Sequence, residues 1–306
     1  MNELQARGKL LISAEYMVLH GSLALVLPLK KKQILKKIRS ENRNSFTWTA
    51  YRETDLWFRA EFRPSTLEVV TASNAEMAER LRMLLRTCVE LNPSFHRELL
   101  IWDVETRLDF SPEWGFGSSS TLTALMAEWA GVNALDLHFM ISEGSGYDVA
   151  CAVADRAIVY SLQDKEPRYE PVLFQPPFAD QLYFVWLGSK QPTALHLREM
   201  AGRLNPGKEL IRSFSMLTRG MLGSKELDDF RNYMEEHEAK LSELTGLERV
   251  SLTRFPGLQG SVKSLGAWGG DFVMIASDQQ TDALYNYLDK LGFSCRFRFK
   301  ELIHEA

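Results

Sequence analysis

The sequence has few cysteines and no long apolar run, and each absence excludes a class of protein. Its three cysteines are odd in number and far apart, without zinc-site spacing, which predicts buried free thiols and no disulfide framework. No apolar run reaches the roughly 18 residues that would span a bilayer. The apolar stretch 10–29 also lacks the basic start and small-residue cleavage site of a signal peptide. We therefore expect a cytoplasmic protein without membrane contact.

The sequence also has no large excess of charge of either sign. The chain has 36 basic and 40 acidic side chains, a net charge of -4, so nothing predicts a nucleic-acid partner. The one basic stretch, within 30–39, is either a solvated strand face or a contact for a polyanion. The 306 residues are 45% apolar, enough for a sizeable core, and the length favours about two domains.

Alternation and helical periodicity predict an α+β protein. We expect strands at 4–14, 23–39, 45–51, 56–63, 98–109, 181–188, 272–276 and 293–299. We expect helices at 75–91, 119–130, 208–222, 225–244 and 279–291, and one more that begins near Tyr147. The densest proline cluster, within 163–180, predicts a crossing between a domain at 1–170 and a domain at 171–306.

The strongest motif is Ser-Pro-Glu-Trp-Gly-Phe-Gly-Ser-Ser-Ser-Thr at 111–121, directly before a predicted helix. Gly115 and Gly117 allow a tight turn and close approach of the backbone to a ligand. Three serines follow at the helix start, where free N–H groups and the helix dipole bind anions: Ser118, Ser119 and Ser120. An ordinary serine N-cap needs one serine and no pair of glycines, so the motif favours a phosphate site. It is not a P-loop, because no lysine follows the second glycine.

Two further glycine segments are weaker. In Gly-Ser-Gly-Tyr-Asp-Val-Ala-Cys-Ala at 144–152, Asp148 lies just inside a helix. Its carboxylate either accepts a proton from a hydroxyl or interacts favourably with the helix dipole. The segment 264–271, which contains Gly269 and Gly270, is either a tight entry to a strand or a ligand contact.

Taken together, these segments resemble the GHMP kinase superfamily. Residues 8–21 look like its first motif, and residues 112–121 look like its phosphate loop with Phe116 in place of leucine. Residues 264–271 look like its C-terminal glycine motif, with Trp268 where glycine is usual. The motifs span nearly the whole chain. The resemblance implies an N-terminal α+β nucleotide-binding domain and a C-terminal ferredoxin-like GHMP kinase domain.

The resemblance also implies a reaction, the ATP- and Mg²⁺-dependent phosphorylation of a small acidic metabolite. The loop at 115–120, with Gly269 and Gly270, would cradle the ATP phosphates, and Ser119 would help to hold Mg²⁺. Asp148 would orient or deprotonate the acceptor hydroxyl. Lys9 would lie near that carboxylate and offset developing charge, unless it is a solvated strand lysine.

Within the superfamily, the block at 144–150 and the pair Glu15 and Tyr16 look most like mevalonate and phosphomevalonate kinases. Tyr16 stands where many relatives have histidine, which favours the phosphomevalonate branch. Lys190 and Thr193 are candidates for binding the acidic acceptor, or else belong to an exposed polar loop. Two alternatives stay open: an enzyme like diphosphomevalonate decarboxylase, and a non-catalytic sensor of metabolite or nucleotide. The chain is expected to be a monomer or a homodimer.

Overall fold

The computed structural model describes residues 2–42, 44–154, 156–188, 205–266 and 272–305. These residues form two compact units, each built from separate stretches of the chain. Unit 1 takes in the chain up to Gly8, Lys31–Pro112 and Phe116–Val153; unit 2 takes in Lys9–Lys30, Glu113–Gly115 and the chain from Ala154 onward. The division into domains 1–170 and 171–306 stays a prediction.

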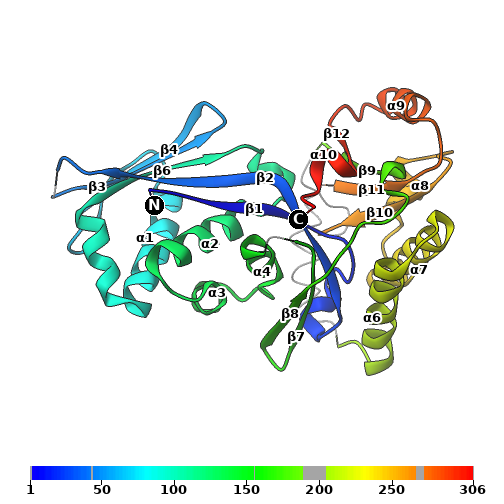
Figure 1. Cartoon of the computed structure of the whole chain (residues 1–306), viewed down its shortest axis with the longest axis horizontal. Helices are drawn as coiled ribbons and strands as arrows, with labels where there is room; N and C mark the ends of the chain where they lie inside the picture. Colours follow the sequence, from blue (N-terminus) through cyan, green and yellow to red (C-terminus); the bar gives the residue numbers. More distant parts are fainter. Residues whose placement is uncertain (1, 43, 155, 189–204, 267–271, 306) are drawn as a thin grey trace. The chain divides into compact units, whose positions relative to one another are not determined.

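Unit 1 is built on a sheet in the order β5-β4-β3-β6-β2, in which β3 and β6 are parallel and the other neighbours antiparallel (Figure 1). The strands are β2 (Ala24–Arg39, the second half in this unit), β3 (Phe46–Arg52), β4 (Asp55–Phe62), β5 (Val69–Ala72) and β6 (Trp102–Leu108). β1 (Glu3–Leu11) pairs with β2. On β3, Phe46 and Trp48 are buried while Thr47 is partly exposed, so period-two alternation decides which face packs.

Four helices of unit 1 pack against one another: α1 (Ala75–Leu91), α2 (Ser118–Ala130), α3 (Ala134–Ile141) and α4 (Tyr147–Val153). The side chain of Asn74 caps α1 by accepting a hydrogen bond from the Met77 N–H at 2.9 Å. Gly131, with φ +66°, ends α2. Helix and strand side chains share one core, which includes Phe46, Trp48, Leu85, Leu125 and Trp129.

Unit 2 contains a four-stranded antiparallel sheet in the order β10-β11-β9-β12. The strands are β9 (Leu182–Trp186), β10 (Ser261–Leu265), β11 (Phe272–Ala276) and β12 (Arg296–Arg298). The helices are α6 (Lys208–Gly223), α7 (Leu227–Thr245), α8 (Val250–Arg254), α9 (Thr281–Lys290) and α10 (Phe299–Leu302). α7 packs against both α6 and β10. The first part of β2 pairs with the hairpin of β7 (Ile158–Gln163) and β8 (Glu166–Pro171).

The predicted α+β class is confirmed, and α1 has the predicted bounds 75–91. Three strand predictions have wrong bounds. The strand expected at 4–14 ends at Leu11. The strand expected at 98–109 starts later, because Pro93–Leu100 form a 3-10 helix. The strand expected at 293–299 is shorter at both ends: it starts only at 296, and Phe299 already begins α10.

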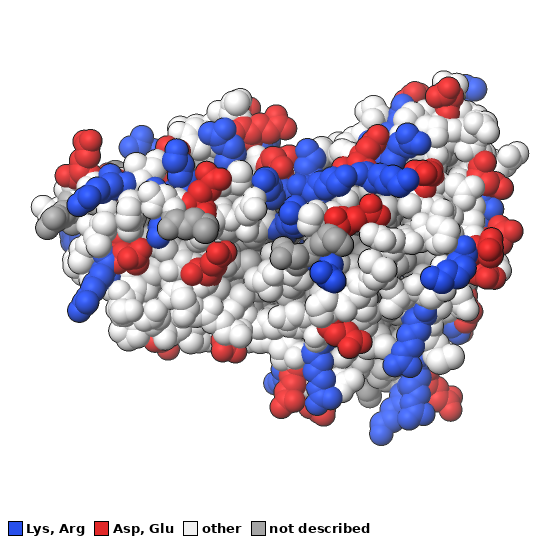
Figure 2. Space-filling model, in the orientation of Figure 1, with Lys and Arg blue, Asp and Glu red and all other residues white. Residues whose placement is uncertain are grey.

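The basic stretch of β2 contacts the protein's own polar groups. Lys32 Nζ donates to Gln5 Oε1 at 2.9 Å, and Lys37 Nζ lies 3.6 Å from a Glu98 carboxylate oxygen. Basic and acidic side chains are mixed over the face that Figure 2 shows. These contacts are typical of a solvated strand face.

Cys88 and Cys151 are buried, as predicted, but Cys295 is partly exposed, so the prediction of buried thiols is wrong there. Burial raises the pKa of the Cys88 thiol to about 12, which keeps it protonated. Within the described part of the chain, no helix is long and apolar enough to cross a membrane.

Candidate active site

The loop before α2 has the backbone conformation that its two glycines favour. Gly115 has φ +68° and Gly117 φ +90°, both in the left-handed region. Gly117 is the N-cap of α2, and no side chain forms a capping hydrogen bond there. The first N–H groups of the helix therefore have no partner within the helix and lie at the positive end of its dipole. This arrangement fits the phosphates of ATP.

The three serines of the loop differ in what their hydroxyls do. The buried Ser120 hydroxyl donates to the Gly117 carbonyl at 2.8 Å, and Thr121 donates to Gln33 Oε1 at 2.6 Å. These two bonds hold the start of the helix. Ser118 is half-buried and Ser119 is exposed, and neither hydroxyl has a hydrogen bond to another described residue. The structure thus leaves these two hydroxyls available for a ligand.

The first half of the loop is fixed within unit 2. Lys9, only 8% exposed, donates from Nζ to the Gly115 carbonyl at 3.0 Å. The Trp114 ring packs edge-on against Phe272 and Phe297, with ring centroids 6.2 and 5.6 Å apart. Sequence reasoning missed this anchor, since an aromatic residue in a glycine loop has no pattern of its own.

Asp148 lies in the first turn of α4, whose start depends on Gly146. Gly146 has φ +81°, and a Cβ atom there would come within 3.0 Å of Leu135 and 3.2 Å of Phe139. The positive φ therefore favours glycine there, and a side chain would also force Leu135 and Phe139 of α3 to shift. The Asp148 carboxylate is half-buried and accepts a hydrogen bond from the Val149 N–H at 3.0 Å. Because α4 packs against α2, unit 1 brings the helix that carries Asp148 next to the helix that carries the three serines.

Glu15 belongs to a cluster of four buried ionisable residues in unit 2, of which sequence reasoning found only this one. Lys263 Nζ donates to Glu15 Oε1 and, at 2.9 Å, to the Ser264 carbonyl. His237 Nε2 lies 3.2 Å from Glu15 Oε2, and Glu238 Oε1 lies 3.8 Å from Lys263 Nζ. All four side chains are at most 1% exposed. They come from distant parts of the sequence, so no local spacing predicts the cluster.

Burial sets the charges of the cluster. It raises the pKa of Glu15, against the opposing effect of the Lys263 ammonium. Burial and the neighbouring Lys263 hold the pKa of His237 well below its usual range, so the imidazole is neutral. Burial raises the pKa of Glu238 to about 7. The Lys263 ammonium pairs more closely with Glu15 than with Glu238. Glu238, with a pKa of about 7, holds a proton below that pH.

We expect Glu238→Gln to stabilise the protein above pH 7 and to change little at pH 5. The pKa of Glu238 rises from an ordinary 4.5 to about 7 on folding. Wild-type stability therefore falls as pH rises between these values, by about 3 kcal/mol in total. Glutamine has no proton to lose. Unfolding midpoints from pH 4.5 to 8.5 measure the difference. Glu243→Gln, an exposed position on the same helix, is the control; equal pH profiles for Glu238→Gln and wild type would contradict the assignment.

Four predicted site residues lie outside the described residues: Lys190, Thr193, Gly269 and Gly270. Trp268 lies there too. Among the residues that are described, no group of three or more metal-binding side chains occurs. The exposed Ser119 hydroxyl nevertheless fits a Mg²⁺ ion that takes most of its oxygen ligands from ATP and water.

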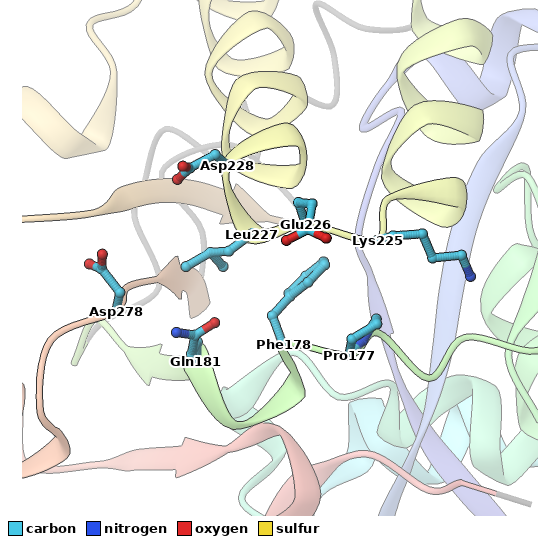
Figure 3. A pocket seen from close by; sticks show the side chains of 8 residues that line it. All are labelled: Pro177, Phe178, Gln181, Lys225, Glu226, Leu227, Asp228 and Asp278. Carbon is cyan, nitrogen blue, oxygen red and sulfur yellow. The ribbon is translucent and has the colours of Figure 1, made fainter.

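A surface pocket of about 360 Å³ lies elsewhere in unit 2, beside the start of α7 (Figure 3). It contains none of the predicted site residues. Its lining has three carboxylates, Glu226, Asp228 and Asp278, against one lysine. Asp228 and Asp278 both pair with Arg231, at 3.1 and 2.8 Å. A pocket bordered by carboxylates does not favour a phosphate ligand.

Solved structures of several kinases are similar to this chain. A Streptococcus pneumoniae phosphomevalonate kinase, in complex with phosphomevalonate and AMPPNP, matches with a TM-score of 0.72 and 16% identity over 97% of this chain and 100% of that one. A Methanococcus jannaschii mevalonate kinase matches with a TM-score of 0.69 and 14% identity over 99% and 98%. A Lactococcus lactis galactokinase, complexed with galactose, matches with a TM-score of 0.63 and 11% identity over 99% and 93%.

The chain therefore has the fold of the GHMP kinases, the superfamily that its motifs resemble. Kinases of the mevalonate branch are among the structures that share this fold, together with kinases that act on sugars. No protein-family model and no curated protein matches the sequence.

Proposed function

We propose that the protein is an ATP-dependent kinase of a small acidic metabolite. It would transfer the γ-phosphoryl group to a hydroxyl or phosphate of a compound such as mevalonate or phosphomevalonate. The observation that carries this proposal is the uncapped start of α2 behind Gly117, in a chain with the GHMP kinase fold. An anion site of this kind is what phosphoryl transfer needs, because that reaction depends on positioning and charge neutralisation.

The phosphate loop would bind the nucleotide. The N–H groups of Ser118, Ser119 and Ser120 would donate to phosphate oxygens, while Gly117 leaves room for the backbone to approach them. The Ser119 hydroxyl would be a ligand of Mg²⁺, which supplies charge neutralisation between phosphate oxygens when bound. Ser120 would hold the loop through its bond to Gly117.

Asp148 would act on the acceptor. Its carboxylate would accept the hydroxyl proton as the acceptor oxygen forms its bond to the γ-phosphorus and the bond to ADP breaks. When the acceptor is a phosphate, the carboxylate would only orient it. Lys9, held at the Gly115 carbonyl, would offset the negative charge that develops there.

We expect four further residues to bind the acceptor: Glu15 and Tyr16, which follow β1, and Lys190 and Thr193. The ammonium of Lys190 and the hydroxyl of Thr193 are groups that bind a carboxylate or phosphate. These residue types support an acidic acceptor over a neutral sugar.

An ADP-release screen tests the function. The purified chain is incubated with Mg²⁺, ATP and, in separate reactions, mevalonate, phosphomevalonate, homoserine and galactose. We expect ADP release with mevalonate or phosphomevalonate, and ³¹P spectra of the product tell a new phosphate ester from a new diphosphate. Reactions with excess EDTA are the control for the metal.

The other outcomes identify the alternatives. Carbon dioxide release with phosphate production would identify a decarboxylase. ATP binding without ADP release for any acceptor would contradict the proposal and favour a non-catalytic sensor.

A further inference from the structure

The turn that follows β1 has a backbone conformation that its own residues do not favour. Ala14 has φ +63° and Tyr16 φ +62°, in the left-handed region that only glycine enters at little cost. Such residues persist only where the surrounding structure holds them, and they concentrate at functional sites. The contacts of the Ala14–Tyr16 turn must therefore supply the free energy that holds this unfavourable backbone conformation.

His237, on α7, provides one of these contacts. The Ala14 N–H donates to His237 Nε2 at 2.9 Å. The Phe214 ring lies perpendicular to the imidazole, with centroids 4.9 Å apart, and fixes its plane. Because the buried imidazole is neutral, its Nε2 lone pair is available to accept this bond and the proton is on Nδ1.

Lys263, on β10, provides the second contact. Its ammonium donates to Glu15, the central residue of the turn, and to the Ser264 carbonyl on its own strand. The turn is thus bonded to β10 through a side chain that is fully buried. α6 adds a third contact, since Ser13 Oγ lies 2.8 Å from Thr218 Oγ1.

Stability alone does not account for these residues. Buried ionic groups lose their hydration, and apolar side chains of the same volume often stabilise a fold as well or better. Hydrogen bonds, unlike apolar contacts, require one direction and one distance. A buried polar cluster around strained backbone is thus suited to fixing a geometry.

We propose that His237 and Lys263 are positioning residues for the acceptor: through Ala14 and Glu15 they hold the Ala14–Tyr16 turn in the conformation that binds it. The proposal rests on the proposed function, because the turn is taken to contact the acceptor. Glu15, only 1% exposed, then acts by fixing the turn. Tyr16, 8% exposed, would contact the acceptor with the small part of its side chain that is not buried.

The test compares three variants. His237→Leu removes the acceptor of the Ala14 N–H, and His237→Gln restores an acceptor at similar reach. Val262→Ala is the control: Val262 lies on β10, and the core cluster in which it packs contains no residue of the turn. Amide exchange at Ala14 and the KM values for acceptor and ATP are measured for each.

We expect His237→Leu to speed exchange at Ala14 and to raise the acceptor KM, each about tenfold, with the KM for ATP unchanged. His237→Gln should recover most of both effects, and Val262→Ala should show neither. Unchanged exchange and KM in His237→Leu would overturn the proposal, and so would an equal rise of KM in Val262→Ala.

Failure of the proposed function gives a different result. In that case the wild-type protein phosphorylates none of the acceptors. The exchange measurement needs no substrate, so it still decides whether His237 holds the turn: faster exchange in His237→Leu alone supports the holding role, and unchanged exchange refutes it.

Discussion

Asp148→Asn should retain ATP binding and lose phosphoryl transfer, with kcat falling by about 10²- to 10⁴-fold. Asparagine keeps the size and the hydrogen-bond acceptor of the side chain, but it neither takes up a proton nor provides a full negative charge. Single-turnover assays with the acceptor identified by the ADP screen measure the effect, and nucleotide titration measures the retained affinity.

The matched control for this variant is Asp136→Asn. Asp136 is an exposed carboxylate in the first turn of α3, in the same unit and with the same relation to its helix dipole. If the only role of Asp148 were a favourable interaction with the helix dipole, the two variants would lose similar, small amounts of stability and neither would lose activity. Retained turnover in Asp148→Asn would therefore refute the catalytic role.

Lys263→Met should destabilise the protein by about 3–5 kcal/mol. The methionine leaves the Glu15 carboxylate buried without its ammonium partner, in a place where Glu15 is 1% exposed. The carboxyl must then be protonated or stay charged without compensation, and both cost free energy. Thermal and denaturant unfolding measure the loss.

A double variant separates charge from packing. Glu15→Gln with Lys263→Met removes both charges and keeps similar volumes, so it should recover at least half of the lost stability. If the double variant is as unstable as Lys263→Met, the loss comes from altered packing, and the assignment of an ion pair between Glu15 and Lys263 is wrong.

Some elements could be predicted because their determinants are local. α1 matches its predicted bounds since Asn74 caps it and its apolar residues recur with helical spacing. The loop before α2 could be predicted for the same reason, because Gly115 and Gly117 permit the left-handed conformations that the turn requires.

Other elements depend on contacts that no local pattern contains. The apolar run at 98–101 was assigned to a strand, but short apolar runs do not distinguish strands from helices. The side chain of Asn92 starts the 3-10 helix there, and Phe95 packs against Trp129 with centroids 4.8 Å apart. α3 was not predicted, because its apolar side chains recur at every second position, the spacing of a strand and not of a helix.

The glycines before α4 also have contacts that the local sequence does not reveal. The segment at 144–152 stands out in the sequence for its glycines and Asp148, without a structural role for Gly146. In the structure Gly146 has φ +81°, which favours glycine, and it lies against Leu135 and Phe139 of α3. The local sequence pointed to Gly146, but only the folded structure shows that this glycine packs against α3.

Without disulfides or an excess of one charge, this protein is held together by its own core. The sequence by itself determined its fold class and the glycine loop before α2. These features are short in range, because backbone freedom and helix caps act between near neighbours. Only the tertiary structure decided that Glu15, His237, Glu238 and Lys263 share one buried site. The pKa shifts at this site follow from burial and from neighbours such as Lys263, which is 248 residues from Glu15 in the chain, and neither exists before the chain has folded.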